Sequence, residues 1–372
     1  MIRTDILKIH KGDIYCVLPG CENNIITAIQ KGAKKIIAED YDCRIPTVKV
    51  KNTRNYLNNY LKRYSRLLKD INIIAVSGSF NKSIAFIIYK ILKSLNVKVG
   101  YIGKKEFYKS KKICDINHRE SDDIYNMLLD CYQNNYKYVV VEIDEDDIKK
   151  DIYANIKFNV VLLTDIEDVF YMKLLYSKLK NNGIIVMKDD NKYIDYINPA
   201  KTKIYGFNKS DYKIVKYTLT KNYTLFTFLH NGKYYNFKTN TLGISNINNI
   251  LSIVVTLLHI GISHEKIATI ISKVTIPYYM ESIKYNNKYI VINDIKTLDD
   301  VKHILKEIVP YHFNKIYVIT NSTNKIIINY LNNHVKYLLL TNNMNKTLKS
   351  VVNKLHENNL LLIMEDGRIS QL

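Results

Sequence analysis

The sequence predicts an α/β protein of three domains: a central domain with a parallel sheet, a small N-terminal α/β domain and a C-terminal βαβ domain. Three observations support this prediction. The 372 residues are enough for two or three domains. Residues 74–85 have the pattern of a buried strand, a tight turn and the start of a helix. From residue 289 onward, short apolar runs alternate with helical patterns, as in βαβ units.

The predicted N-terminal domain covers residues 1–68. Turn residues and short apolar runs alternate along it, so we expect a small α/β unit. Its expected elements are a strand within residues 12–20, a helix over 25–32 that ends at a glycine, strands at 34–38 and 47–50, and a helix over 55–68.

The predicted central P-loop domain covers residues 69–276 and opens with the Ser-Gly-Ser-Phe-Asn-Lys-Ser segment of residues 77–83. Such a loop points backbone N–H groups and a helix N-terminus at an anion. Lys82 would then reach the β- and γ-phosphates of a nucleotide, and Ser83 would bind Mg²⁺. Asn81 stands where the usual motif has glycine, but asparagine tolerates a left-handed backbone. An ordinary strand–helix turn is the alternative interpretation.

The rest of this domain predicts a parallel sheet followed by antiparallel strands. Residues 138–143 are apolar on both faces, which is typical of a central parallel strand. The other expected elements are strands at 97–102, 160–163 and 183–187, a helix over 122–131, antiparallel strands within 203–239 and a helix over 243–259.

Acidic residues follow the strand at 138–143. Ligands of open α/β sheets bind at the carboxyl ends of the strands. Because Mg²⁺ takes carboxylate, water and phosphate oxygens, Glu142 is a candidate Mg²⁺ ligand beside the P-loop. For residues 144–147, all of them Asp or Glu, a solvated acidic helix start is the alternative.

The predicted C-terminal domain covers residues 277–372. Alternating strands and helices indicate a small parallel sheet. The expected strands are 289–292, 316–320, 335–340 and 360–364, and the expected helices are 298–308, 325–331 and 346–356.

Composition limits the partners and the compartment. A net charge of +20 suggests a polyanionic partner, but the lysines are spread along the whole chain without a dense block, which argues against nucleic acid. The five cysteines have no metal-type or redox-type spacing and indicate free thiols in a reducing compartment. The longest apolar run, residues 250–262, is shorter than the ~20 residues of a membrane span. We expect a cytoplasmic monomer.

Motifs in order along nearly the whole chain resemble those of the Mur ligases, specifically the UDP-N-acetylmuramoyl-tripeptide synthetases. Residues 11–20 resemble the family's Pro-Gly-Asp-Leu-Phe-Val-Ala-Leu-x-Gly, and residues 76–83 its Val-Thr-Gly-Thr-Asn-Gly-Lys-Thr. Further matches are 28–33 with Ala-x-x-x-Gly-Ala, 141–143 with Met-Glu-Val, 243–249 with Gly-x-Phe-Asn-Val-Tyr-Asn, 277–281 with the Gly-Arg-x-Glu hinge and 295–299 with Ala-His-Thr-Pro-Asp.

The resemblance implies a three-domain fold and an ATP-dependent reaction. ATP phosphorylates a substrate carboxylate, and an amino group attacks the acyl phosphate to form an amide. The substrates implied are a UDP-muramyl peptide and an amino acid. Lys82 would be catalytic, and Ser83 and Glu142 would bind Mg²⁺. The nucleotide would be held by Gly78, Ser79, Asn81, Lys82, Ser83, Asn246 and Asn249.

The chain also departs from the family's motifs. Residues 144–146 replace its Ser-Ser-His, Val169 replaces a histidine, and Tyr279 replaces the hinge arginine. The uridine-side Asp-Ser-Arg is Asp-Ile-Leu at 5–7. Residues 320–325 have lost a glycine-rich segment, and residues 342–345 keep little of the Asp-Asn-Pro-Arg that reads the amino acid. The lysine that the family carbamylates corresponds to Lys173 or Lys178.

Two hypotheses follow for the function. The first is a Mur-type amide ligase acting on a UDP-muramyl peptide or a related carboxylate. The alternative is a noncatalytic relative that binds nucleotide, muramyl peptide or a protein. Loss of one transition-state contact typically lowers a rate by about 10²–10³, so several losses together can abolish turnover.

Overall fold

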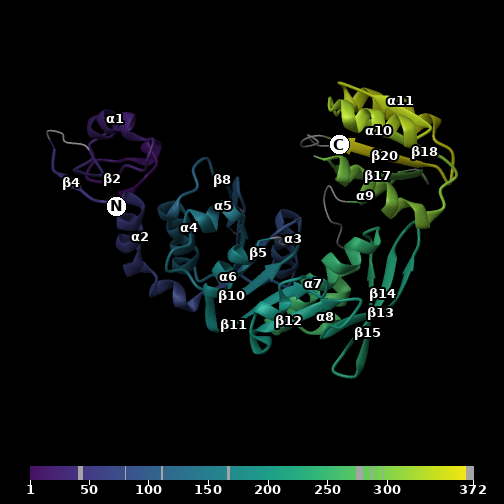
Figure 1. The fold of residues 1–372 in the computed structure, drawn as a ribbon, viewed down its shortest axis with the longest axis horizontal. Coiled ribbons are helices and arrows are strands. Elements are labelled where there is room, and N and C mark those ends of the chain that lie inside the picture. The colour runs from purple at the N-terminus through teal and green to yellow at the C-terminus, as the bar shows by residue number, and fades with distance from the viewer. Residues whose placement is uncertain are drawn as a thin grey trace. The chain divides into compact units, whose positions relative to one another are not determined.

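The computed structural model describes residues 1–40, 45–79, 81–109, 112–165, 168–273, 280–285, 288–295 and 297–365 (Figure 1). The chain divides into two compact units. The first comprises Met1–Val186 and Asn191–Thr202, and the second comprises Met187–Asp190 and Lys203–Leu372. The predicted α/β class is confirmed, whereas the three domain ranges (1–68, 69–276 and 277–372) stay a prediction.

The first unit begins with a small parallel sheet in the order β1-β2-β3-β4. Its core gathers around Tyr15, Ile25 and Ile36, all fully buried. The predicted helix at 55–68 is shorter than expected and gives way to 3-10 turns after Leu61. The elements are β1 (Ile2–Arg3), β2 (Ile14–Cys16), α1 (Ile25–Gln30), β3 (Lys35–Ala38), β4 (Thr47–Lys49) and α2 (Thr53–Leu61).

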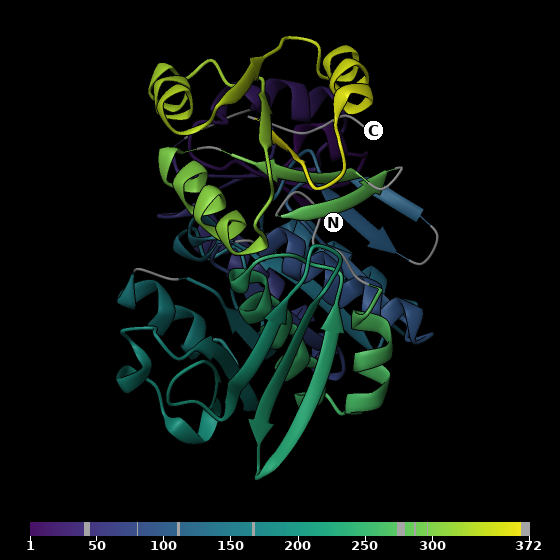
Figure 2. The same ribbon diagram turned by 90° about the vertical axis from the view of Figure 1, so that its right-hand side faces the viewer.

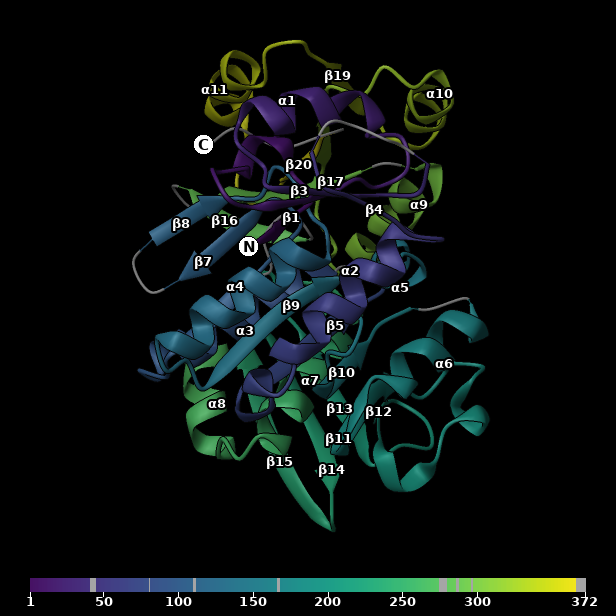
Figure 3. The same cartoon turned by 90° about the vertical axis from the view of Figure 1, so that its left-hand side faces the viewer.

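The larger sheet of this unit has the strand order β11-β10-β5-β9-β6-β7-β8. Strands β10, β5, β9 and β6 are parallel, and α3 packs on β5, β9 and β6 (Figure 3). The antiparallel β6-β7-β8 meander was not predicted. The bounds are β5 (Asn72–Ser77), α3 (Asn81–Ser94), β6 (Val99–Ile102), β7 (Glu106–Lys109), β8 (Lys112–Asp115), α4 (Ser121–Gln133), β9 (Tyr138–Ile143), α5 (Glu145–Lys149), β10 (Phe158–Leu163), α6 (Val169–Ser177) and β11 (Leu179–Lys188).

The second unit contains three long antiparallel strands, β13 to β15 (Figure 2). The prediction of antiparallel strands within 203–239 holds for these three, but β12 pairs with β13 in parallel. Helix α7 is buried along most of its length, from Asn246 to Leu257. The bounds are β12 (Thr202–Gly206), β13 (Tyr212–Leu219), β14 (Thr224–His230), β15 (Lys233–Thr239), α7 (Ile244–His259) and α8 (His264–Ile271).

The last part of this unit is the predicted βαβ sheet, in the order β16-β17-β20-β18-β19. Within the described residues, β16 and β17 pair antiparallel, and the pairings β17–β20, β20–β18 and β18–β19 are parallel; β16 was not predicted. Leu242, which precedes α7, lies in the same core as Val291 and Ile304. The bounds are β16 (Glu281–Tyr285), β17 (Lys288–Asp294), α9 (Leu298–Ile308), β18 (Ile316–Thr320), α10 (Lys325–His334), β19 (Tyr337–Leu340), α11 (Met344–Lys354) and β20 (Leu360–Glu365).

Some sequence predictions fall outside the described residues. Among them are Tyr279 of the hinge motif, Lys296 and Cys43. The other four cysteines are free thiols, as expected: Cys16, Cys21, Cys114 and Cys131. No helix within the described ranges is both long and apolar enough to span a bilayer.

Candidate functional site

The predicted loop lies between β5 and α3, as a P-loop requires. Gly78 follows the buried Ser77 and has a φ of +100°, a conformation that favours glycine. A Cβ atom at Gly78 would lie 2.6 Å from Thr164 Oγ1, so the close approach also requires glycine. Asn81 is the first residue of α3 and is not among the positive-φ residues, so its tolerance of a left-handed backbone is not used.

Side chains from neighbouring strands hold this loop in place. Thr164, directly after β10, approaches the loop with its hydroxyl 2.5 Å from the Ser79 carbonyl and 3.2 Å from the Ser77 carbonyl. The Asn81 amide donates to the Ile143 carbonyl at the end of β9, at 3.2 Å. The loop is therefore tied to both strands that flank β5.

Tyr171 of α6 also contacts the loop. Its hydroxyl lies 2.5 Å from Ser77 Oγ. Burial raises the pKa of Tyr171, so the phenol keeps its proton at neutral pH. Neither Thr164 nor Tyr171 was predicted from the sequence to belong to the site. The position of Thr164 could have been recognised, since it follows a buried parallel strand at the carboxyl edge, where ligands bind.

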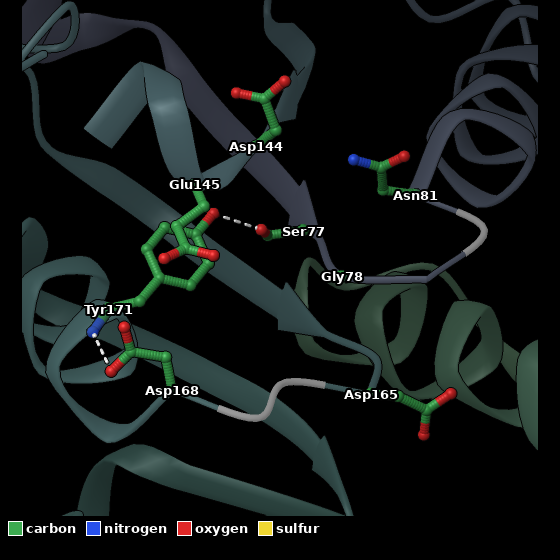
Figure 4. Close-up of a pocket in the computed structure, with 8 residues that line it drawn as sticks. All are labelled: Ser77, Gly78, Asn81, Asp144, Glu145, Asp165, Asp168 and Tyr171. Atoms are coloured by element: carbon green, nitrogen blue, oxygen red, sulfur yellow. Dashed lines mark hydrogen bonds between the residues drawn. The ribbon is translucent and has the colours of Figure 1, made fainter. Parts of the chain in front are cut away.

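A pocket of about 480 Å³ opens at this edge of the sheet (Figure 4). Its lining comes from the ends of β5, β9 and β10 and from the first turns of α3, α5 and α6. Four of the lining residues are carboxylates. The lining residues are Ser77, Gly78, Asn81, Asp144, Glu145, Asp165, Asp168 and Tyr171.

Among the described residues, partners are found for Asp144, Glu145 and Asp168. Asp144 pairs with Lys104, and Glu145 pairs with Lys149. Asp168 caps α6 by accepting from the backbone N–H groups of residues 170 and 171. Burial alone would raise the pKa of Asp144, but the hydrogen bond from Lys104 and a backbone hydrogen bond at Asp147 lower it.

The acidic run after β9 does start a helix. Asp144 is the N-cap of α5, and it exchanges hydrogen bonds with Asp147 in a capping box. The structure thus agrees with the interpretation of residues 144–147 as a helix start, although Asp147 is buried rather than solvated.

Glu142, the predicted Mg²⁺ ligand, is buried and does not line the pocket. Its Oε1 accepts from the Tyr101 hydroxyl at 2.9 Å, and its Oε2 accepts from the Lys104 backbone N–H at 2.7 Å. Burial and the Glu142 carboxylate both raise the pKa of Tyr101. A metal bound by Glu142 would have to replace at least one of these hydrogen bonds.

Arg119 is a buried cation that binds several groups at this edge of the sheet. Its guanidinium donates to the Gly103 and Glu142 carbonyls, to Asp147 and to the Tyr153 hydroxyl. Burial acts to lower the pKa of Arg119, but Tyr153 and Asp147 raise it overall, so the charge is retained. No sequence motif pointed to Arg119, because only the fold brings these partners together.

The other predicted residues of the first unit lie in varied surroundings. Lys82 and Ser79 are exposed, Ser83 is half-buried, and none of the three lines the pocket. The two candidates for the family's modified lysine also lie outside the lining. Lys173 lies 5.3 Å from the centre of the Tyr196 ring, and Lys178 pairs with Asp151 at 2.8 Å.

Asn246 and Asn249 belong to the second unit, at the start of α7. The Asn246 amide donates to the Leu242 carbonyl at 2.7 Å, and the Asn249 amide donates to Asn246 Oδ1 at 3.2 Å. Glu307 of α9 caps this helix by accepting from the N–H and hydroxyl of Ser245.

Within the described residues, no group of three or more His, Cys, Asp or Glu side chains is arranged to hold a metal ion. The carboxylates of the pocket are nonetheless the ligand type that Mg²⁺ prefers, and the lining also offers the hydroxyl of Ser77. The residues present therefore fit a metal that binds together with a phosphorylated ligand.

The fold and this site define an α/β protein with a P-loop-type turn. Residues 82–257 match the Mur ligase middle domain. The resemblance to the Mur ligases identified from the sequence is therefore confirmed.

Two curated relatives illustrate the extent of the similarity. A UDP-N-acetylmuramoyl-L-alanyl-D-glutamate–2,6-diaminopimelate ligase of Aquifex aeolicus is 24% identical over 322 residues, which are 80% of this chain and 67% of that protein. A UDP-N-acetylmuramyl-tripeptide synthetase of Borrelia garinii is 28% identical over 276 residues, which are 64% of this chain and 54% of that protein. The alignments thus span about half to two thirds of these relatives.

Solved structures share the fold at low sequence identity. A UDP-N-acetylmuramoyl-L-alanyl-D-glutamate–2,6-diaminopimelate ligase matches with a TM-score of 0.78 and 15% identity, over 98% of this chain and 88% of that chain. The MurF ligase of Thermotoga maritima in complex with ADP matches with a TM-score of 0.69 and 14% identity, over 98% and 93% of the two chains.

Proposed function

We propose that this chain is an ATP-dependent amide ligase of the Mur type. It joins the amino group of an amino acid to a carboxylate of a UDP-muramyl peptide or a related acid, in the cytoplasm. The observation that carries the proposal is the β5–α3 turn, which opens into a pocket whose acidic lining comes from the ends of β9 and β10.

The residues of the turn would hold the triphosphate. Gly78 and Ser79 lie in the turn before α3, and the N–H groups and dipole at the start of a helix favour anions. Lys82, exposed in the first turn of α3, has the reach of a flexible side chain toward the terminal phosphates. By resemblance, Asn246 and Asn249 lie near the adenine.

The metal would be held by Ser83 and by carboxylates at the ends of the strands. Glu142 is the ligand that the resemblance implies, and Asp144 and Asp165 line the pocket itself. A bound Mg²⁺ would neutralise charge on the transferred phosphoryl group.

The reaction would proceed in two steps. An oxygen of the substrate carboxylate attacks the γ-phosphorus, and ADP leaves as an acyl phosphate forms. The amino group then attacks the acyl carbon, loses a proton and displaces phosphate, which leaves an amide. Exclusion of water protects the acyl phosphate between the two steps.

Phosphate release tests this proposal. The purified chain is incubated with Mg·ATP, a panel of UDP-muramyl peptides and a panel of amino acids. We expect release of phosphate only when a muramyl peptide and an amino acid are both present. Lys82→Ala should abolish release, whereas Lys90→Ala, an exposed position on the same helix, should preserve it. A melting-temperature shift with Mg·ATP but no phosphate from any pair would instead identify a nucleotide-binding, noncatalytic relative.

A further inference from the structure

Lys104 lies at the carboxyl edge of the sheet. The sequence did not predict a role for it. It follows β6, and β6 is hydrogen-bonded to β9, which in turn pairs with β5. The P-loop follows β5. Lys104 and the loop therefore lie at the same edge of the sheet, separated by two strand spacings, about 10 Å.

Lys104 contacts two of the acidic residues at the end of β9, Glu142 and Asp144. Its backbone N–H donates to Glu142 Oε2 at 2.7 Å, and its ammonium pairs with Asp144 Oδ2. Glu142 is the expected metal ligand, and Asp144 lines the pocket. Lys104 therefore contacts a carboxylate with each end of the residue: its backbone N–H binds Glu142, and its ammonium balances the charge of Asp144.

The backbone at Lys104 is fixed by buried contacts. The neighbouring Gly103 carbonyl accepts from Arg119, which also holds the Glu142 carbonyl and Asp147. The Gly103 N–H donates to the Glu106 carbonyl at 2.9 Å. The ammonium end is accessible to solvent, because the side chain of Lys104 is 52% exposed.

We propose that Lys104 is a second phosphate-binding lysine of this site. When the site is empty its ammonium pairs with Asp144, and when a nucleoside triphosphate binds it contacts the phosphate oxygens. This inference rests on the proposed function, and it assigns to the β6–β7 loop a positive charge in addition to those of Lys82 and the metal.

The electrostatics of the pocket support this role. Four carboxylates line it, and neither Lys82 nor Lys104 is a lining residue, although Lys104 pairs with the lining residue Asp144. A triphosphate that enters must be met by cations, and Lys104 is already anchored beside the lining. Its removal should cost about tenfold or more in affinity, the usual range for a hydrogen bond to a charged group. It should also make binding more dependent on Mg²⁺.

The test measures binding of a fluorescent ATP analogue to the full chain, across a series of Mg²⁺ concentrations. Lys104→Ala retains the backbone N–H to Glu142 and removes the ammonium together with the aliphatic chain that carries it. Lys105→Ala is the matched control, because the adjacent side chain is also exposed. Lys104→Arg tests rescue by a retained charge. Melting temperatures verify that all variants fold, which we expect because exposed ion pairs contribute little to stability.

We expect Lys104→Ala to raise the dissociation constant about tenfold and to shift the Mg²⁺ midpoint upward, while Lys105→Ala matches the wild type and Lys104→Arg retains most of the affinity. Equal affinity and equal Mg²⁺ midpoints for Lys104→Ala and Lys105→Ala would overturn the inference and leave the proposed function intact. Absence of binding by the wild-type chain at every Mg²⁺ concentration would overturn both.

Discussion

The carboxylate of Glu307 should be a main stabilising contact between α9 and the start of α7. Its side chain is only 10% exposed, and it accepts from Ser245 Oγ at 2.8 Å and from the Ser245 N–H at 3.3 Å. It thus satisfies a donor at a helix N-terminus and complements the helix dipole. Beside it, the Tyr311 hydroxyl accepts from the Gly243 N–H at 2.6 Å.

The magnitude follows from these contacts. A capping side chain contributes about 0.5–2 kcal/mol, and a hydrogen bond to a charged group about 1.5–3 kcal/mol. We expect Glu307→Ala to cost about 2 kcal/mol and Glu307→Gln about 1 kcal/mol, because glutamine keeps an acceptor but loses the charge. A loss of about 2 kcal/mol corresponds to a roughly thirtyfold larger equilibrium constant for local opening.

Hydrogen exchange at the first turn of α7 measures this effect directly. The Ser245 amide should exchange roughly thirtyfold faster in Glu307→Ala. The control is Lys306→Ala, an exposed neighbour on α9, for which protection should be unchanged. If the two variants show equal protection at residues 243–246, then the carboxylate does not cap the helix in solution and the reasoning is wrong.

Three further substitutions test the first unit. Gly78→Ala should lower Mg·ATP affinity more than tenfold, because its Cβ would lie 2.6 Å from Thr164 Oγ1 at a φ of +100°; equal affinity in a titration would contradict this. Arg119→Leu should lower the free energy of unfolding by about 3–5 kcal/mol, measured in urea, because it leaves a buried carboxylate unpaired. Burial raises the pKa of Asp122 from 3.8 to about 6. The native state therefore holds the extra proton between those values, and its stability falls as pH rises through about 6; Asp122→Asn should remove that part of the slope in melting temperatures from pH 4 to 7.

The central strands could be predicted because burial on both faces leaves a clear pattern. Residues 138–143 were predicted and found as β9 without a shift of either end. The missed strands have the opposite character. β1 has only two residues, and β7 and β8 are edge-side strands rich in Lys and Glu or Asp, so neither apolar alternation nor a continuous apolar run marks them.

The site was only partly visible in the sequence for a related reason. The P-loop segment is contiguous, so its residue types and spacing predicted the turn at Gly78 and the helix after it. Lys104, Arg119 and Tyr171 reach the same edge from three separate segments, and their roles depend on which strands are neighbours. The order of residues along the chain does not by itself show which strands are neighbours in the sheet.

The net charge of the chain and the charge of the pocket lining have opposite signs. The net charge is +20, yet the pocket is lined by four carboxylates. Residues 144–146 replace the Ser-Ser-His of the resembling family, and this change alone adds three acidic groups at the end of β9. Two like charges about 6 Å apart repel by roughly 3 kcal/mol at an effective dielectric of about 20. A triphosphate in this pocket would therefore depend on cations more than the family's neutral motif requires. The net positive charge of the distant surface cannot substitute for them, because salt screens it beyond about 10 Å.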